Sequence, residues 1–565
     1  MEEIINQKPC AVQKIETSQG FSVSYKEHIL YSKYNPGKNI ITLVEKLQLL
    51  PGTIILCCSP LLGYGLAELL QKLPENCLAI LCEAEQTLYD FSETEGCLKT
   101  TDGRVLKIPP EKLSELPIEI YNLAKFGLYK RVIRLDFSAG IQFNSDFYNR
   151  LFSACSDSLM TFWKNRITLT KFGRRYSKNL FENLHYLAKT KPVTDFFGNI
   201  DKPIIVFGAG ESTQDLINRL LGRYSPYNGK LPFYILCADT ALQPLLKNGI
   251  RPDGVFIEEA QSVIMKAFIG TLKASDKTRI FAGLSSLPNL VHKAGVENTS
   301  FFFTEYAEGS FFNSLKQKKS FIPPANLPFG SVGLTAVYYA LKFRKNEDIP
   351  VYVAGLDFAY SIGLTHTKGA LAHILRLIQA NRIAPPENYA AAYGLGTEKI
   401  SGKNGHMVIT SPTLKSYAGM FQSYFSETKN LFDAGESGID LGLPKVNIDS
   451  LVTDTHCNDG GVKEAEDHSN SFEKEISDFL TGERGVLEEL RNLLTGHTEL
   501  KGNELLSEIE KLAAPREYLY LHFADGCQFS SSQSFLNRIR TEIDFFLKIL
   551  KTKKIKVRVP ATAKK

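Results

Sequence analysis

Short, almost continuously apolar runs alternate with amphipathic segments through the middle of the chain. The apolar runs occupy residues 203–208, 233–238, 254–258, 279–283, 300–305 and 350–355. Segments with apolar residues every three or four positions, typical of helices, lie between most of them, as at 212–224, 240–249 and 332–345. Strands that are apolar on both faces belong to a parallel sheet covered on both sides by helices. The pattern predicts a doubly wound α/β domain here.

A shorter segment of the same kind precedes this domain. Alternating runs at residues 21–26 and 28–34 predict a β-hairpin. An apolar strand at 52–58 then leads into a turn with two glycines and an amphipathic helix. This order predicts a Rossmann-like N-terminal domain.

Two acids follow the next apolar strand of that segment, at Glu83 and Glu85. An acid at this place in a Rossmann-like unit often meets a ribose. The turn before it, with Gly63 and Gly65, does not complete the G-x-G-x-x-G fingerprint. A methyltransferase-like ligand site is therefore only a minor hypothesis for this segment.

The remaining segments are mostly helical. Residues 155–200 read as helices that connect domains, and 416–428 predict a further helix. The polar, glycine-rich stretch 454–471 reads as a linker, and strongly helical patterns follow it. We expect an N-terminal Rossmann-like domain at 1–165, a central α/β domain at 166–453, and a linker with a helical C-terminal domain at 454–565.

Composition narrows the class of protein. The 565 residues are 43% hydrophobic and 22% charged, and the net charge of +5 is small for a dedicated nucleic-acid binder. The ten cysteines form no C-x-x-C pair, which favours reduced thiols, and neither a signal peptide nor an apolar run long enough to span a bilayer is visible. We expect a cytoplasmic protein that binds no nucleic acid and is not an integral membrane protein. The basic residues of 548–565 read as a solvated tail, with binding to an acidic partner or a membrane surface as the alternative.

Ligands of open parallel sheets bind at the carboxyl ends of the strands, so small and polar residues at those ends are the candidates for chemistry. The first strand of the central domain leads into Gly208, Ala209, Gly210, Glu211 and Ser212. Glycines let amide groups approach a phosphate, and the start of the next helix adds positive charge. A carboxylate at that place repels a phosphate, so Glu211 must point away, meet a sugar hydroxyl or base, or stabilise the helix dipole.

Other strand ends carry similar groups. Asp239 and Thr240 follow the second strand, where Asp239 either caps a helix or binds a nucleoside. Gly330, Ser331 and Gly333 begin another helix and form a second candidate anion site.

The last strand ends at Gly355 and Asp357, and His366 lies in the loop beyond it. His406 lies in a further loop. Either histidine can accept a proton from a hydroxyl near neutral pH.

Several motifs are missing from the chain. It has no P-loop, no H-E-x-x-H, no Cys/His cluster, no G-x-S-x-G and no D-x-D. These absences argue against a P-loop kinase, zinc chemistry and an α/β-hydrolase. The residues predict no metal site, and a need for magnesium is left open.

Four segments taken in order, 207–216, 237–259, 329–343 and 351–369, resemble the central domain of the motility accessory factor family. These proteins are flagellin glycosyltransferases of motile bacteria, and the resemblance covers about residues 200–440. Their central fold is similar to sialyltransferases that use a cytidine-monophosphate-activated (CMP-activated) sugar. The resemblance implies inverting transfer of a pseudaminic- or legionaminic-type nonulosonic acid from a CMP-activated donor to Ser or Thr of flagellin. It implies no further cofactor, and the oligomeric state is left open.

The resemblance also implies roles for particular residues. The segments from Gly208 to Ser212 and from Gly330 to Gly333 line the nucleotide and phosphate, and Asp239 touches the nucleoside. Asp357 organises the floor of the site, Tyr360 steadies the leaving phosphate, and His366 or His406 is the base.

Three features depart from the family pattern. Glu211 stands where the family has Pro, Thr213 stands where it has Leu, and the strand after Asp253 ends in two glutamates where Asp is usual.

Two rival readings stay open. A pterin diphosphokinase-like enzyme would move pyrophosphate from ATP and would need carboxylates for magnesium, which Glu211, Glu258 and Glu259 could supply. The third possibility is a flagellin-binding export factor that has lost catalytic activity and binds flagellin through its C-terminal helices.

Overall fold

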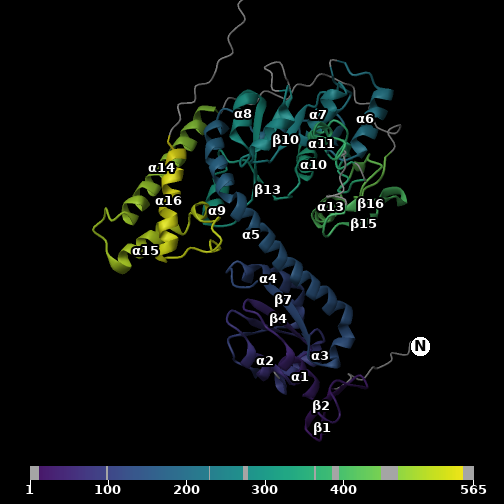
Figure 1. Cartoon of the computed structure of the whole chain (residues 1–565), viewed down its shortest axis with the longest axis vertical. Helices are drawn as coiled ribbons and strands as arrows, with labels where there is room; N and C mark the ends of the chain where they lie inside the picture. Colours follow the sequence, from purple (N-terminus) through teal and green to yellow (C-terminus); the bar gives the residue numbers. More distant parts are fainter. Residues whose placement is uncertain are drawn as a thin grey trace, which may run out of the picture. The chain divides into compact units, whose positions relative to one another are not determined.

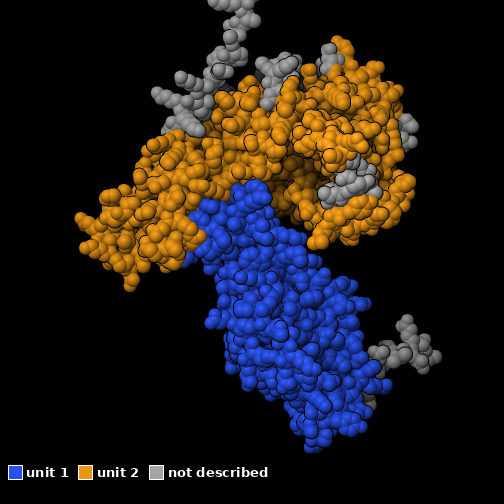
Figure 2. All heavy atoms as spheres, viewed as in Figure 1, with its two compact units in different colours: residues 1–173, 520–530 blue, residues 174–519, 531–565 orange. Residues whose placement is uncertain are grey.

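The computed structural model describes residues 12–96, 99–227, 229–271, 278–361, 364–384, 393–446 and 469–551. The chain forms two compact units, coloured separately in Figure 2. Unit 1 comprises residues 1–173 with 520–530, and unit 2 comprises residues 174–519 with 531–565. The boundary between them falls inside one long helix, α5 (Ser145–Leu187). That single helix occupies most of the region where the sequence predicted helices at 155–200.

Unit 1 contains a four-stranded parallel sheet in the order β6-β5-β4-β7. Its strands are β4 (Thr53–Cys58), β5 (Leu78–Cys82), β6 (Val105–Ile108) and β7 (Arg131–Asp136). Unit 1 also contains helices α1 (Lys38–Lys46), α2 (Leu66–Lys72), α3 (Gln86–Thr94) and α4 (Leu116–Ala124) (Figure 1). Every residue of β4 and β5 is buried, which explains their continuous apolar sequence. The predicted Rossmann-like order is confirmed.

The predicted N-terminal hairpin is part of a small antiparallel sheet. Its strands are β1 (Gln13–Thr17), β2 (Gly20–Tyr25) and β3 (His28–Ile29), paired in that order.

Unit 2 is built on an eight-stranded sheet in the order β13-β12-β11-β10-β9-β8-β14-β17, parallel throughout. Its strands are β8 (Ile204–Phe207), β9 (Tyr234–Ala238), β10 (Gly254–Ile257), β11 (Arg279–Gly283), β12 (Thr299–Thr304), β13 (Ala325–Asn326), β14 (Val351–Ala354) and β17 (Leu431–Asp433). The six apolar runs of the sequence are the six longest of these strands, so the α/β prediction is confirmed.

The strand order places a topological switch point between β8 and β14. From β8 the chain adds β9 to β13 successively on one side and then returns to place β14 on the other side. Ligands of such sheets bind outside the carboxyl ends of the two strands at this point. The turns that follow Phe207 and Ala354 are therefore the first place to look for a site.

Helices on both sides of this sheet complete unit 2. They are α6 (Ser212–Arg223), α7 (Asp239–Lys247), α8 (Pro288–Ala294), α9 (Ser310–Lys316), α10 (Val332–Phe343), α11 (Leu371–Gln379) and α13 (Pro412–Phe425). A two-stranded antiparallel sheet, β15 (Glu398–Ser401) and β16 (Met407–Thr410), precedes α13.

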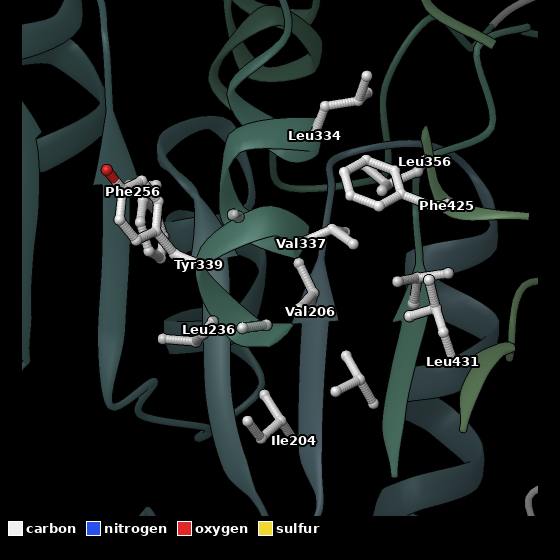
Figure 3. Close-up of a cluster of buried hydrophobic side chains, with 14 of the residues drawn as sticks. Ile204, Val206, Leu236, Phe256, Leu334, Val337, Tyr339, Leu356, Phe425 and Leu431 are labelled. Atoms are coloured by element: carbon white, nitrogen blue, oxygen red, sulfur yellow. The ribbon is translucent and has the colours of Figure 1, made fainter. Parts of the chain in front are cut away.

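The main core of unit 2 lies between α10 and the sheet (Figure 3). Helix α10 packs on β8, β9, β10 and β14. Phe256 stacks on Phe281 at 4.8 Å and on Tyr339 of α10 at 5.6 Å between ring centroids. All three rings are almost inaccessible to solvent, and burying a side chain of this kind stabilises the fold by about 1.5–3 kcal/mol. This packing fixes the start of α10 at the carboxyl edge of the sheet.

The C-terminal helices are α14 (Ser469–Leu494), α15 (Gly502–Ala513) and α16 (Gln533–Ile549), with α14 contacting both others. Glu517, which follows α15, accepts hydrogen bonds from the first amides of α9, at Ser310 (2.6 Å) and Phe311 (2.9 Å). A carboxylate at a helix N-terminus both satisfies free amides and stabilises the helix dipole. The C-terminal helices are thus joined to the α/β part of unit 2.

The segment 520–530 belongs to unit 1 although the helices around it belong to unit 2. The guanidinium of Arg166 in α5 donates hydrogen bonds to the carbonyl oxygens of Leu521 and Phe523. Arg166 is only 6% exposed.

Two predicted features lie outside the described residues. They are the linker from 454 to 468 and the basic tail beyond residue 551. Among the helices that the structure describes, none combines the length and the apolar character needed to cross a membrane.

Candidate functional site

The glycine turn after β8 packs directly against the turn after β14. The amides of Gly208 and Gly210 donate to the carbonyl oxygens of Ala354 and Gly355, each at 2.8 Å. A Cβ atom on Gly208 would clash with the Gly355 carbonyl, and one on Gly210 would lie 2.5 Å from the Asp357 carboxyl carbon. These glycines are therefore required by the contact between the two turns at the switch point.

Asp357 closes the start of α6. Its carboxylate accepts a hydrogen bond from the Ser212 amide at 2.9 Å and a second from the Ser212 hydroxyl. The same hydroxyl oxygen accepts a hydrogen bond from the Gly355 amide at 2.9 Å. Ser212 is fully buried and Asp357 is 3% exposed.

This geometry corrects one part of the sequence analysis. The amides of Gly210 and Ser212 were expected to face a phosphate, but in the structure they donate to protein oxygens. The carboxylate of Asp357 already occupies the place that an anion takes at a helix N-terminus. Binding a phosphate to the Ser212 amide would require Asp357 to leave.

A buried ion pair lies next to Asp357. Lys403 Nζ is 2.6 Å from Asp433 Oδ2, and their side chains are 1% and 2% exposed. Burial raises the pKa of Asp357 to about 6, while the hydrogen bonds from Ser212 and the charge of Lys403 oppose the shift. Burial likewise raises the pKa of Asp433, and Lys403 opposes it. One lysine thus compensates two buried carboxylates at the ends of β14 and β17.

The same lysine fixes the β15–β16 hairpin to the sheet edge. Lys403 lies in the hairpin turn, and its amide donates to the Gly438 carbonyl oxygen at 2.9 Å. On the other side of the hairpin, Tyr360 and Ile409 pair through their backbones. His406 is in the same turn, and its side chain is exposed.

The side chain of Glu211 turns toward the loop after β14. Its Oε2 accepts a hydrogen bond from the Ser361 hydroxyl at 2.7 Å. Glu211 itself has helical backbone angles just before α6. The acid thus joins the two turns of the switch point through a side-chain contact.

His366 lies in a loop that rests on the glycine turn. The amide of the next residue, Thr367, donates to the Ala209 carbonyl oxygen at 2.8 Å. The His366 ring is partly buried, and its Nδ1 is 3.2 Å from the Thr365 hydroxyl. Burial lowers its pKa, and the charge of Arg376 lowers it further, so the ring is held neutral and able to accept a proton.

Two carboxyl groups lie at the ends of β9 and β10. Asp239 is 6% exposed and accepts a hydrogen bond from the Thr240 amide at 2.6 Å. Burial raises its pKa to about 7, and the negative charges of Glu259 and Glu258 add to the shift. Glu258 accepts hydrogen bonds from the hydroxyls of Thr304 and Thr335, and burial raises its pKa as well.

Sequence reasoning missed Thr304 and Thr335. Thr304 ends β12, so the rule of reading every strand end would have found it. Thr335 lies in the first turn of α10.

The second predicted anion site is explained in part by packing. A Cβ on Gly333 would clash with Leu356 of the β14 turn. Gly330 has a φ of 71° and lies close to the Tyr417 ring, so both geometry and space favour glycine there. Ser331 precedes α10, and its carbonyl oxygen accepts hydrogen bonds from the amides of Leu334 and Thr335.

The predicted residues thus separate into groups. The structure joins Gly208, Gly210, Ser212, Gly355 and Asp357 directly at the switch point. His366 adjoins them through Ala209, and Glu211 through Ser361. Residues Gly330 to Gly333, Tyr360 and His406 lie on neighbouring segments. Within the described residues, no hydrogen bond or ring contact joins His406 to His366.

The carboxylates required by the magnesium-dependent alternative each have a protein hydrogen-bond donor. Glu211 binds Ser361, Glu258 binds two threonines, and Glu259 accepts a hydrogen bond from the Gln261 amide at 2.7 Å. Across the described part of the chain, no group of three or more acidic, His or Cys side chains is arranged to hold a metal ion.

The corresponding place in unit 1 is filled by a buried polar network. Glu83, expected to meet a ribose, is 2% exposed and accepts hydrogen bonds from the hydroxyls of Ser59 (2.8 Å) and Tyr148 (3.1 Å). Burial raises its pKa to about 7. Glu85 accepts a hydrogen bond from the Tyr25 hydroxyl at 2.6 Å. Both acids therefore have protein partners.

Comparison with known proteins agrees with this architecture. Residues 178–363 match the model of a family described as 6-hydroxymethylpterin diphosphokinase MptE-like. An uncharacterized protein of Treponema pallidum (strain Nichols) is 31% identical over 561 residues, which cover 95% of this chain and 94% of that protein.

A solved structure shares the fold over almost the whole chain. It is the structure of a Maf glycosyltransferase from Magnetospirillum magneticum AMB-1, with a TM-score of 0.54 and 14% identity over 96% of this chain and 92% of that one. The chain belongs to one family with the treponemal protein, and its fold is that of a motility accessory factor glycosyltransferase, as the resemblance of the sequence motifs predicted.

Proposed function

We propose that this protein is a glycosyltransferase that moves a nonulosonic acid, of pseudaminic or legionaminic type, from a CMP-activated donor to Ser or Thr hydroxyls of flagellin. The observation that carries the proposal is the switch point of unit 2. There the glycine turn of β8, the Asp357 turn of β14 and the His366 loop come together. The glycosyltransferase fold of the solved relative supports the reaction class.

His366 is the base that the geometry favours. Its ring is partly buried and held neutral, and its loop rests on Ala209, whereas the side chain of His406 is exposed in a hairpin turn. In the proposed step, the acceptor hydroxyl oxygen attacks the anomeric carbon and forms the new glycosidic bond. The hydroxyl proton goes to His366, and the bond from the sugar to the phosphate oxygen breaks and releases CMP. Attack from the side opposite the leaving phosphate inverts the anomeric centre.

Other residues have supporting roles in this proposal. Asp357 positions α6 and the glycine turn rather than touching the donor. Asp239 and Glu258, whose carboxyl groups lie at adjacent strand ends, accept hydrogen bonds from the hydroxyl or amine groups of the nucleoside. Tyr360 donates to the leaving phosphate. The proposed location is the cytoplasm.

The test is the mass of flagellin after incubation with the purified protein and a CMP-activated nonulosonic acid. We expect one sugar mass to be added for each modified hydroxyl. His366→Ala should lower the rate by about a hundredfold or more, the usual contribution of a general base. His292→Ala is the matched control, because this exposed histidine ends α8, away from the carboxyl edge of the sheet. An unchanged flagellin mass with the wild-type protein would refute the proposal.

The same preparation separates the alternatives. Binding of CMP without metal supports the transferase, whereas binding of ATP only with magnesium supports the pyrophosphate transfer. If His366→Ala and His406→Ala leave both transfer and flagellin binding intact, neither histidine is the base. Flagellin binding by a wild-type protein that never transfers sugar supports the non-catalytic factor.

A further inference from the structure

Four basic side chains gather beside the His366 loop, and we call them the basic cluster. Lys247 lies in the last turn of α7, Lys368 lies in the loop, and His373 and Arg376 lie on α11. A Cβ on Gly369 would lie 3.4 Å from Lys247 Cδ, so the loop rests against the end of α7. The charges of Lys368, Arg376 and Lys247, after burial, lower the pKa of His373.

The cations of this cluster lack acidic partners in the part of the chain that the structure describes. No ion pair or hydrogen bond joins Lys247, Lys368 or Arg376 to a described carboxylate. Helix dipoles favour a single cation at each helix C-terminus, which explains Lys247 and Arg376 separately. They do not explain why three cations converge next to one loop.

A second observation at the same place points to a missing partner. Thr367, between His366 and Lys368, is 1% exposed, and its hydroxyl has no hydrogen-bond partner among the described residues. Leaving a buried hydroxyl unsatisfied costs about 1–3 kcal/mol, so such groups usually meet a ligand or water. Its own amide already binds Ala209 of the glycine turn.

Acidic and basic side chains occupy different positions around the switch point. The ends of β9 and β10 carry the carboxyl groups of Asp239 and Glu258, and the start of α6 is capped by Asp357. Asp357 excludes an anion from the start of α6, and Asp239 and Glu258 repel one to the extent that they are ionised. The charges of Arg376, Lys368 and Lys247 next to the His366 loop are positive.

We infer that the basic cluster binds the anionic oxygens of the donor, so that its phosphate or sugar carboxylate lies beside His366 and Thr367. This inference rests on the proposed function for the identity of the donor. Arg376 suits this role because a guanidinium can bind a phosphate or carboxylate through two parallel hydrogen bonds. The neutral, hydroxyl-rich part of the donor then lies toward the carboxyl groups of Asp239 and Glu258.

This arrangement couples donor binding to the base. Burial lowers the pKa of His366 in the free protein, and the positive charge of Arg376 lowers it further. An anion bound to Arg376 cancels that field, so the pKa of His366 should rise when the donor binds. A donor bound to Arg376 would therefore make His366 a stronger base.

The experiment measures binding by calorimetry with four probes: CMP, cytidine, inorganic pyrophosphate and N-acetylneuraminic acid. CMP against cytidine reports the phosphate, and N-acetylneuraminic acid reports the sugar carboxylate. The variants are Arg376→Gln and Lys368→Gln, with Lys293→Gln as a control in α8 that keeps the same change of net charge as the Lys368 variant. Thermal melting confirms that each variant is folded.

We expect Arg376→Gln to weaken CMP or N-acetylneuraminic acid binding by about tenfold or more, as for lost hydrogen bonds between charged groups, with cytidine and the control unaffected. Nuclear magnetic resonance of the His366 ring should show its pKa rising on addition of the anion, and rising in free Arg376→Gln. Wild-type binding of CMP and of N-acetylneuraminic acid, with no loss of either in the two variants, would overturn the inference and leave the proposed function standing. Pyrophosphate binding that depends on the cluster, without binding of CMP, would keep the anion site and refute the proposed donor. If none of the anions binds the wild-type protein, the inference is wrong.

Discussion

The buried pair of Lys403 and Asp433 makes the sharpest prediction about stability. Replacing Lys403 with Met removes the positive charge that pairs with Asp433. It also removes the positive charge that partly offsets the burial of the Asp357 carboxylate. Breaking a buried pair on one side costs about 3–5 kcal/mol, because the remaining charge stays desolvated. The side chains are 1% and 2% exposed, so water cannot take over the role of the lysine. We therefore expect Lys403→Met to lower the free energy of unfolding of unit 2 by about 4 kcal/mol.

The double variant Lys403→Met/Asp433→Asn provides the matched control. Asparagine keeps an oxygen acceptor for the Gly435 amide, which donates to Asp433 Oδ1 at 3.0 Å, but carries no charge. The double variant should therefore lose only about 1–2 kcal/mol, mostly from packing and from Asp357. A cost below about 1 kcal/mol for the single variant, or no recovery in the double variant, would refute the argument.

The measurement has to follow unit 2 separately. Hydrogen exchange of the peptides that contain β14 and β17 reports on the strands next to the pair. The single tryptophan, Trp163, lies in the part of α5 that belongs to unit 1, so its fluorescence follows unit 1 as an internal reference. A pH series adds a second signature. Both aspartates have raised pKa values, so acidification from about pH 8 to pH 5 should restore part of the stability of Lys403→Met as they become protonated.

Two further predictions concern the same edge of the sheet. Gly210→Ala should destabilise unit 2 by about 1–3 kcal/mol, because the added Cβ would press on the Asp357 carboxyl group. Gly222→Ala is the control and should be neutral or stabilising, because the space around this position in α6 is open. Chemical denaturation compares the two variants, and equal effects would contradict the packing argument. Asp239 has a pKa of about 7 against 3.8 for the free side chain, so the charged form is disfavoured in the folded state and stability should increase as the pH falls through 7. Between about pH 8 and pH 5 the gain is about 2–3 kcal/mol at 1.4 kcal/mol per pKa unit, and Asp239→Asn should lack it; an identical pH profile in that variant would show that another group titrates.

The sequence predicts the sheet well and the site only in outline. The strands of unit 2 are buried on both faces, so each of them is written as a continuous apolar run such as 203–208. The candidate site depends instead on which strands become neighbours. Ser212 and Asp357 are 145 residues apart, and only the return of the chain to place β14 beside β8 brings them together.

Lys403 illustrates a second limit. A lysine between two glycines in a polar turn is typical of an exposed loop, yet its side chain is 1% exposed. Its burial follows from Asp433, whose strand forms the edge of the sheet. The sequence shows no local signal for a partner so distant. The basic cluster escaped notice for the same reason, since Lys247 and Arg376 lie on separate helices.

The segment 520–530 determines when unit 1 can finish folding during translation. Ribosomes make the chain from the amino end, so Arg166 leaves the ribosome hundreds of residues before Leu521 and Phe523, whose carbonyl groups it will bind. Until then the Arg166 guanidinium lacks these two hydrogen-bond acceptors, and the surface of α5 around Gly173 that will contact Leu521 is exposed to solvent. Unit 1 can therefore reach its final form only after residues 520–530 have been translated. Unit 1 is therefore completed only after residues 174–519 of unit 2 have been synthesised.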